Sequence, residues 1–169
     1  SANAAGTGAQ NECTGNPLSG IIVTDAAQPT LEDNICSQNV ESGIAYFEDA
    51  SGTARGNTCT NNGLHGIGDT GRAQPTLTGN TCSDNEQVGI RFSDSSGGRA
   101  LQNECTRNGL SGILVREGAN PTLENNTCTD NEENGIAYFG EASSAARGNT
   151  CTSNGLHGIS VNDQTQPTL

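Results

Sequence analysis

Seven cysteines recur along the chain at one fixed interval, and this spacing constrains the fold more than any other feature. Every gap between successive cysteines is 23 residues, in the column Cys13, Cys36, Cys59, Cys82, Cys105, Cys128 and Cys151. One Asn stands two residues before each cysteine, in the column Asn11, Asn34, Asn57, Asn80, Asn103, Asn126 and Asn149. A second Asn stands three residues after each cysteine, in the column Asn16, Asn39, Asn62, Asn85, Asn108, Asn131 and Asn154. A period this strict identifies a repeat architecture, which has to be assigned before any local secondary structure.

Apolar residues within each repeat alternate with polar ones, which is the pattern of half-buried β-strands. Three short segments, N-x-C-x, G-I-x-V and P-T-L, are separated by Asn, Gly, Asp and Pro, and no helix fits between them. One repeat cannot bury its apolar side alone, whereas like strands stacked on like strands build a shared core. Crossovers between parallel strands are right-handed in nearly all proteins. The sequence therefore predicts an all-β fold, a single-stranded right-handed parallel β-helix (solenoid) of about seven 23-residue coils with three short parallel sheets.

The whole chain, residues 1–169, is expected to form this one solenoid. Its coils are predicted at 10–32, 33–55, 56–78, 79–101, 102–124, 125–147 and 148–169. Neither end shows an evident cap, and an uncapped solenoid exposes strand edges. We therefore expect either a segment of a longer protein or head-to-tail self-association of copies.

Two longer periods are superimposed on the 23-residue repeat. The stretch from Gly43 to Ile67 returns nearly unchanged from Gly135 to Ile159, 92 residues later, which indicates growth by duplication in blocks. At the third strand, odd coils carry the Leu of P-T-L, whereas even coils carry Ala54, Ala100 and Ala146. Large and small side chains that alternate along one core column are predicted to interdigitate.

Composition alone would place this chain among disordered proteins. Its apolar share is 31% and its net charge is −12, against about 45–50% apolar residues in ordinary globular domains. The strict repeat argues against disorder, because a thin rod needs few inward residues per coil. All seven cationic residues are Arg, so the acidic chain is not expected to bind nucleic acid or anionic membranes. No apolar stretch is long enough for a transmembrane helix.

The recurring pattern N-x-C-x-x-N-x-x-x-G-I-x-V resembles the signature of the parallel β-helix repeat family, also called the carbohydrate-binding and sugar-hydrolase (CASH) domain. The alternation of P-T-L coils with small-residue coils is most similar to the 23-residue β-helix segments of some F-box-only and bacterial multidomain proteins. The resemblance implies the fold but not one function, because the family includes lyases, epimerases and noncatalytic binding segments. Cys in place of the usual aliphatic residue is the main departure, and it concerns packing more than chemistry.

The cysteine column is expected to point inward as a ladder of free thiols. In-register strands place neighbouring Cβ atoms ~4.8 Å apart, beyond the ~3.5–4.5 Å that a disulfide tolerates. Cys then serves as a small apolar filler, with a metal or redox array as the alternative. Free thiols favour a reducing compartment, although a buried ladder would also survive outside the cell, so localisation stays open. The two Asn columns are expected at tight turns, in the left-handed conformation, with amide groups bonded to the next coil.

Six residues mark the outer face of the Gly-Ile-x-Val strands as the preferred binding face. The two histidines share one column just before Gly-Ile, and the two phenylalanines, which follow a Tyr, are expected to face solvent, where they could stack on a sugar or contact a protein. With two arginines, the candidate set is His65, His157, Phe47, Phe139, Arg91 and Arg116. The alternative for the histidines is a polar turn residue copied by duplication. Asp69 interrupts the inward column between Tyr46 and Phe92, so it is either hydrated or carried by a locally shifted strand.

Acidic residues gather after the Gly-Ile strand, where carboxylates on successive coils could share a cation such as Ca²⁺. This set comprises Asp25, Glu48, Asp49, Asp94, Glu117, Glu141 and Asp163. A second set precedes the strand and comprises Glu41, Asp84, Glu86, Asp130, Glu132 and Glu133. Solvated turn charge that keeps the rod soluble is the alternative, because no D-x-D-x-D-G loop is present. No other cofactor is expected.

Three functions are compatible with these patterns. The first is a noncatalytic module for binding or scaffolding, with a protein or carbohydrate ligand on the Gly-Ile-x-Val face. The second is a fragment of a carbohydrate-active enzyme of the lyase, hydrolase or epimerase type. Such an enzyme needs a unique acid and base constellation, whereas the acids follow the repeat and Lys is absent, so no catalytic residue is assigned. The third is ice binding through the Thr-Cys-Thr face, which Glu12, Ile35 and Glu104 interrupt.

Overall fold

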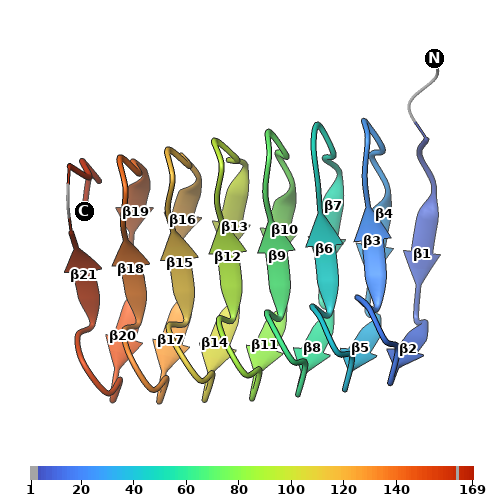
Figure 1. Ribbon diagram of the computed structural model, residues 1–169, viewed down its shortest axis with the longest axis horizontal. Coiled ribbons are helices and arrows are strands. Elements are labelled where there is room, and N and C mark those ends of the chain that lie inside the picture. The colour runs from blue at the N-terminus through green and yellow to red at the C-terminus, as the bar shows by residue number, and fades with distance from the viewer. Residues whose placement is uncertain (1–3, 163) are drawn as a thin grey trace.

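The computed structural model describes residues 4–162 and 164–169, and in this part of the chain it contains 21 strands of three residues each and no helix. The strands form three parallel seven-stranded sheets, here called A, B and C, that wind around one axis (Figure 1). Each coil contributes one strand to each sheet, in the order A, B, C. The predicted all-β parallel solenoid is therefore confirmed.

Sheet A contains β1 (Thr7–Ala9), β4 (Thr30–Glu32), β7 (Thr53–Arg55), β10 (Thr76–Thr78), β13 (Arg99–Leu101), β16 (Thr122–Glu124) and β19 (Ala145–Arg147). Sheet B contains β2 (Glu12–Thr14), β5 (Ile35–Ser37), β8 (Thr58–Thr60), β11 (Thr81–Ser83), β14 (Glu104–Thr106), β17 (Thr127–Thr129) and β20 (Thr150–Thr152). Sheet C contains β3 (Ile21–Val23), β6 (Ile44–Tyr46), β9 (Ile67–Asp69), β12 (Ile90–Phe92), β15 (Ile113–Val115), β18 (Ile136–Tyr138) and β21 (Ile159–Val161). Each residue pairs with the one 23 positions away, as in Cys59 with Cys82.

Two asparagine ladders run the length of the rod and join every coil to the next. Asn57 Nδ2 donates to Asn80 Oδ1 at 2.9 Å and to the Leu31 carbonyl of the preceding coil at 3.0 Å, while the Asn57 backbone N–H donates to the same Asn80 oxygen at 3.0 Å. The predicted amide bonding between coils is confirmed. The predicted left-handed backbone of these asparagines is wrong, because the residue before each ladder Asn takes that conformation, as Asp33 (φ 52) and Gln38 (φ 55) do.

The interior consists of stacked columns of like residues. Leu31, Ala54 and Leu77 lie side by side in sheet A, so the predicted alternation of large and small side chains is present in the core. All seven cysteines are free, with Cys13 and Cys151 half-buried at the two ends and the other five buried. A hydrogen bond with Cys128, together with burial, raises the pKa of Cys105 well above its ordinary value. Hydrogen bonds with neighbouring cysteines lower the pKa of Cys82 and Cys128 instead, so adjacent thiols of the column interact with one another along the rod.

The glycine before each sheet C isoleucine is required by close packing between coils. A Cβ on Gly43 would lie 2.8 Å from the Gly66 carbonyl oxygen and 2.9 Å from Cys59 Cβ. Real Cβ contacts of that length are excluded by sterics. This contact explains why Gly recurs at this position of the repeat.

Sheet A carries one further rung at the C-terminal end, because Thr168 pairs with Ala145. Two copies stacked coaxially in register would have to displace either β1 or this rung, since both occupy sheet A. Head-to-tail association therefore stays a prediction. The described residues include no helix that is long and apolar enough to span a membrane.

Candidate ligand-binding groove

The outer face of sheet C is a trough that runs along the rod. Its floor is formed by the middle residue of each strand, in the order Ile22, Ala45, Gly68, Arg91, Leu114, Ala137 and Ser160. One wall is the fifth residue after each cysteine, where Leu alternates with Glu or Gln: Leu18, Glu41, Leu64, Gln87, Leu110, Glu133 and Leu156. The other wall is the residue that follows each strand: Thr24, Phe47, Thr70, Ser93, Arg116, Phe139 and Asn162. We call this trough the sheet C groove.

Among the described residues, three pockets lie in the sheet C groove. One, of about 500 Å³, lies toward the N-terminal end and is lined by Ile22, Phe47 and Thr70, among others. The other two, here called the first and the second pocket, contain the arginines of the candidate set. The first has a volume of about 180 Å³, a floor that includes Ala45 and Gly68, and walls that include Phe47 and Leu64. His65 and Arg91 close its C-terminal side. The second has a volume of about 390 Å³ and is lined by Leu110, Leu114, Arg116, Glu133 and Phe139, among others. Phe47 and Phe139 are 36% and 37% exposed, which confirms that these rings face solvent.

His65 and Arg91 form the polar centre of the first pocket. Arg91 Nη1 lies 3.3 Å from His65 Nε2. Burial, together with the charges of Arg91 and Arg116, lowers the pKa of His65 to about 4, so its ring is neutral at pH 7. A neutral ring can accept the Arg91 proton at Nε2 only as the tautomer protonated at Nδ1. Arg91 is therefore oriented by a neutral partner and keeps its full charge for a ligand.

Arg91 differs from the arginines that are ion-paired on the surface. Five arginines contact a carboxylate, in the pairs Arg55–Glu32, Arg72–Asp49, Arg99–Glu124, Arg107–Asp84 and Arg116–Glu117. Among the described residues, Arg91 has no such partner, and its Nε is buried without a hydrogen bond. The charges of Glu117 and Asp94 act on Arg91 without forming an ion pair with it, so its guanidinium on the groove floor keeps hydrogen-bond donors for an anion.

The six predicted binding residues are divided by the structure. His65, Arg91 and Phe47 meet in the first pocket, whereas Arg116 and Phe139 line the second. His157 is exposed on the last coil and lines neither pocket, so the two histidines are not equivalent. The wall residues Leu64 and Leu110 were not predicted. Their signal in the sequence is the alternation of Leu with Glu or Gln five residues after each cysteine.

The acidic residues proposed to share a cation occupy corners of the coil. Asp25, Glu48, Asp94, Glu117 and Glu141 have φ angles between 55° and 59°, in the left-handed region. Asp49 is held by Arg72 through two hydrogen bonds of 2.7 and 2.8 Å, which lower the pKa of its carboxyl. Asp163 lies outside the described residues. In the rest of the chain no three His, Cys, Asp or Glu side chains converge on a metal position, so calcium binding stays a prediction.

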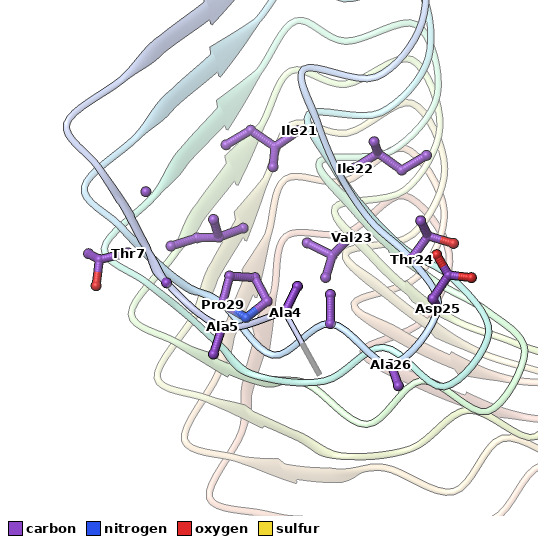
Figure 2. Close-up of a pocket in the computed structure, with 14 residues that line it drawn as sticks. Ala4, Ala5, Thr7, Ile21, Ile22, Val23, Thr24, Asp25, Ala26 and Pro29 are labelled. Carbon is purple, nitrogen blue, oxygen red and sulfur yellow. The ribbon is translucent and has the colours of Figure 1, made fainter. Parts of the chain in front are cut away.

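Another opening, of about 730 Å³, lies at the N-terminal end of the rod. Figure 2 shows Ala4, Ile21, Val23 and Pro29 around it. Val23 belongs to an inward column whose members in the following coils form the core. The opening is thus the interior of the first coil and carries no polar constellation. On sheet B, the outward Thr and Ser columns are interrupted at Glu12, Ile35 and Glu104, and ice binding stays a prediction.

Comparison with known proteins identifies the class to which this fold belongs. A family model described as the right handed beta helix region matches residues 3–101 and 71–169. The chain is therefore a member of the right-handed β-helix family, and the predicted handedness is confirmed.

A solved structure, the A-module of mannuronan C-5 epimerase AlgE4 from Azotobacter vinelandii, superposes with a TM-score of 0.64 at 15% identity. It covers 96% of this chain, which in turn spans 57% of the epimerase chain. At this identity the similarity concerns the fold alone. No curated protein matches the chain.

Proposed function

We propose that this chain is a noncatalytic β-helix module that binds an acidic glycan along the sheet C groove. The observation that carries the proposal is Arg91, a guanidinium on the groove floor, oriented by a neutral His65 and without a carboxylate partner among the described residues. Arginine binds carboxylates and other planar anions through paired hydrogen bonds. An anionic group of a ligand in the groove is the natural partner of this side chain.

The shape of the groove supports a long ligand. Phe47 and Phe139 stand on the same wall four coils apart, a separation of about 19 Å at ~4.8 Å per coil. Arg91 lines the first pocket and Arg116 the second, on two of the three coils between the phenylalanines, so the cationic centre is flanked by an aromatic ring on either side. Exposed aromatic rings offer flat apolar faces to sugar rings. The epimerase with the same fold is named for mannuronan, an acidic polysaccharide, which supports a ligand of this chemical class.

A catalytic role is less favoured by the groove chemistry. Glycoside hydrolysis requires two carboxyl groups that flank one bond. In the first pocket, Glu41 accepts a hydrogen bond from Ser19 at 3.2 Å on the wall, and the Asp69 carboxyl faces the core on the other side of the strand. The alternative of a carbohydrate-active enzyme fragment rests on the conjunction of His65, Arg91 and Glu41 in one pocket.

The test is isothermal titration calorimetry against polymannuronate, polygalacturonate and neutral dextran, with Arg91→Ala and the matched surface control Arg107→Ala. Arg107 is paired with Asp84 outside the groove. We expect the acidic polymers to bind, dextran not to bind, and Arg91→Ala to lose at least about tenfold in affinity, equivalent to ~1.4 kcal/mol. Equal loss in both variants, or binding of dextran alone, would contradict the proposed site. New reducing ends or unsaturated products in the same samples would identify an enzyme, and capture of a protein ligand alone would identify a scaffold.

A further inference from the structure

In the inward columns of coils 33–55, 56–78 and 79–101, three polar side chains are buried without a hydrogen-bond partner. They are the Tyr46 hydroxyl, both carboxyl oxygens of Asp69 and the Ser96 hydroxyl. The exposed fractions of these residues are 0%, 1% and 1%. Buried polar groups in folded proteins are nearly always bonded to protein or to internal water. Three such groups from three successive coils therefore point to a ligand inside the rod.

The duplicated half of the chain does not share this polar interior. Tyr138, 92 residues after Tyr46, has its hydroxyl 2.8 Å from Ser144 Oγ. Gly52 stands where Ser144 would correspond, with φ +99°, and a Cβ there would lie 2.2 Å from the Pro29 carbonyl oxygen. Tyr46 thus cannot gain the serine partner that Tyr138 has. The residue that corresponds to Asp69 is Val161, so the polar interior is a local property of three coils.

Asp69 retains its inward position, because β9 keeps the same register with both neighbouring strands. The possibility of a locally shifted strand is therefore excluded. In its column the short Asp69 side chain stands between the rings of Tyr46 and Phe92, which reduces the bulk of the column at this coil. Ser96 replaces the alanine that recurs in the adjacent inward column at Ala50, Ala73, Ala119 and Ala142.

The spacing of the coils suits a bridging molecule of one particular size. Tyr46 and Asp69 lie on neighbouring coils, as do Asp69 and Ser96, and their polar atoms make no direct hydrogen bond. Groups one coil apart, ~4.8 Å, are within the span of one bridging water. Polar-lined interior space is hydrated in proteins, whereas apolar space stays dry. Hydroxyl and carboxyl groups can each donate and accept, so water can satisfy all three residues.

We propose that these three coils enclose an internal hydration site, in which ordered waters link Tyr46 to Asp69 and Asp69 to Ser96 across successive coils. Burial raises the pKa of Asp69 to about 9, so the carboxyl is neutral at pH 7. The side chains paired with Asp69 in sheet C, Tyr46 and Phe92, bring no cation to it. Neutral donors and acceptors select water over a metal ion, which prefers ionised carboxylate ligands.

The test is magnetic relaxation dispersion of solvent nuclei, which counts internal waters with long residence times, on wild type, Asp69→Val and Tyr46→Phe. Asp69→Val installs the residue of the duplicated coil, and it is expected to lose at least one long-lived water. Tyr46→Phe, which removes only the hydroxyl, is expected to shorten the residence time of that water and reports on the same site if Asp69→Val fails to fold. The matched control is Tyr138→Phe in the duplicated coil, which should keep the wild-type profile because the Tyr138 hydroxyl is already hydrogen-bonded to Ser144.

Three results would overturn the hydration site. The first is a dispersion profile that is the same in wild type and folded Asp69→Val. The second applies if Asp69→Val does not fold, and it is a dispersion profile of Tyr46→Phe that equals the profile of wild type. The third is a rise in the melting temperature of wild type, but not of Asp69→Val, on addition of Na⁺, K⁺ or Ca²⁺, because this would identify a cation as the ligand. None of these readouts depends on glycan binding, so the hydration site and the proposed function can fail separately.

Discussion

Replacement of Asp69 by Asn is expected to change the pH dependence of stability more than any other single substitution. Asn is nearly isosteric with Asp and does not titrate. Burial raises the pKa of Asp69 from 3.8 to about 9 in the folded chain. Below pH 4 the group is protonated in both the folded and the unfolded state, so its titration does not change the free energy of unfolding. Between pH 4 and pH 9 the unfolded state releases the proton and the folded state retains it.

The stability of wild type should therefore fall, relative to Asp69→Asn, as pH rises through this range. A pKa shift of about five units corresponds to up to ~7 kcal/mol, or ~1.4 kcal/mol per pH unit. Ordinary domains have a free energy of unfolding of ~5–15 kcal/mol, so this loss is a large fraction of the total. Carboxyls with lowered pKa, such as Asp49 and Asp84, act in the opposite direction. They are common to both proteins and cancel in the difference.

Urea denaturation of both proteins at pH 4, 5.5, 7 and 8.5, followed by circular dichroism, measures this difference. The free energy of unfolding of Asp69→Asn minus that of wild type is expected to grow steadily with pH and to level off near pH 9. A difference that stays constant to within about 1 kcal/mol across this range would refute the neutral, buried carboxyl. Asp69→Val should show the same dependence with a larger stability at every pH, because it also removes the buried polar group.

Three further predictions concern the ladders and the core. Asn80→Ala removes the two hydrogen bonds that Asn80 Nδ2 donates and the two that Asn80 Oδ1 accepts from Asn57, so it should cost about 2–4 kcal/mol in urea denaturation. Asn61→Gly, at an exposed corner with φ 56°, should cost almost nothing. Leu77 lies between Ala54 and Ala100, which are too small to fill the cavity that Leu77→Ala would leave. A destabilisation of ~2–5 kcal/mol is therefore expected in urea denaturation. A cost below that of an exposed substitution would contradict the packing. Ellman titration of unfolded, unreduced protein should find seven thiols, and far fewer than seven would indicate disulfides. In folded protein the half-buried Cys13 and Cys151 should react first.

The fold could be predicted because the 23-residue period leaves little choice of register. One residue per coil in each column fixes which side chains stack, and the Leu31 and Ala54 alternation then follows without further information. The left-handed corner could not be assigned correctly from residue type. Asn is typical of that conformation. Here the Asn amide must lie along the ladder, so the preceding residue, such as Asp33 or Gln38, takes the left-handed backbone conformation instead.

For the binding groove, the sequence pattern predicted which face of the solenoid carries it but not its walls or its pockets. The phenylalanines were placed correctly because strand alternation fixes their direction. The equivalence suggested by the two histidines fails, because His65 is buried in contact with Arg91 from the next coil, whereas His157 is exposed. The Leu and Glu wall was missed because its alternation is visible only when the repeats are aligned against the groove floor.

Solution NMR of the isotopically labelled chain, titrated with oligomers of an acidic glycan, tests the central proposal most directly. Amide shift changes are predicted along β6, β9, β12, β15 and β18, with the largest at His65 and Arg91 and with Phe47 and Phe139 as the outer limits. The outward residues of sheets A and B should not change. Shift changes confined to the Thr face of sheet B or to the ends of the rod, with none in the sheet C groove, would contradict the account.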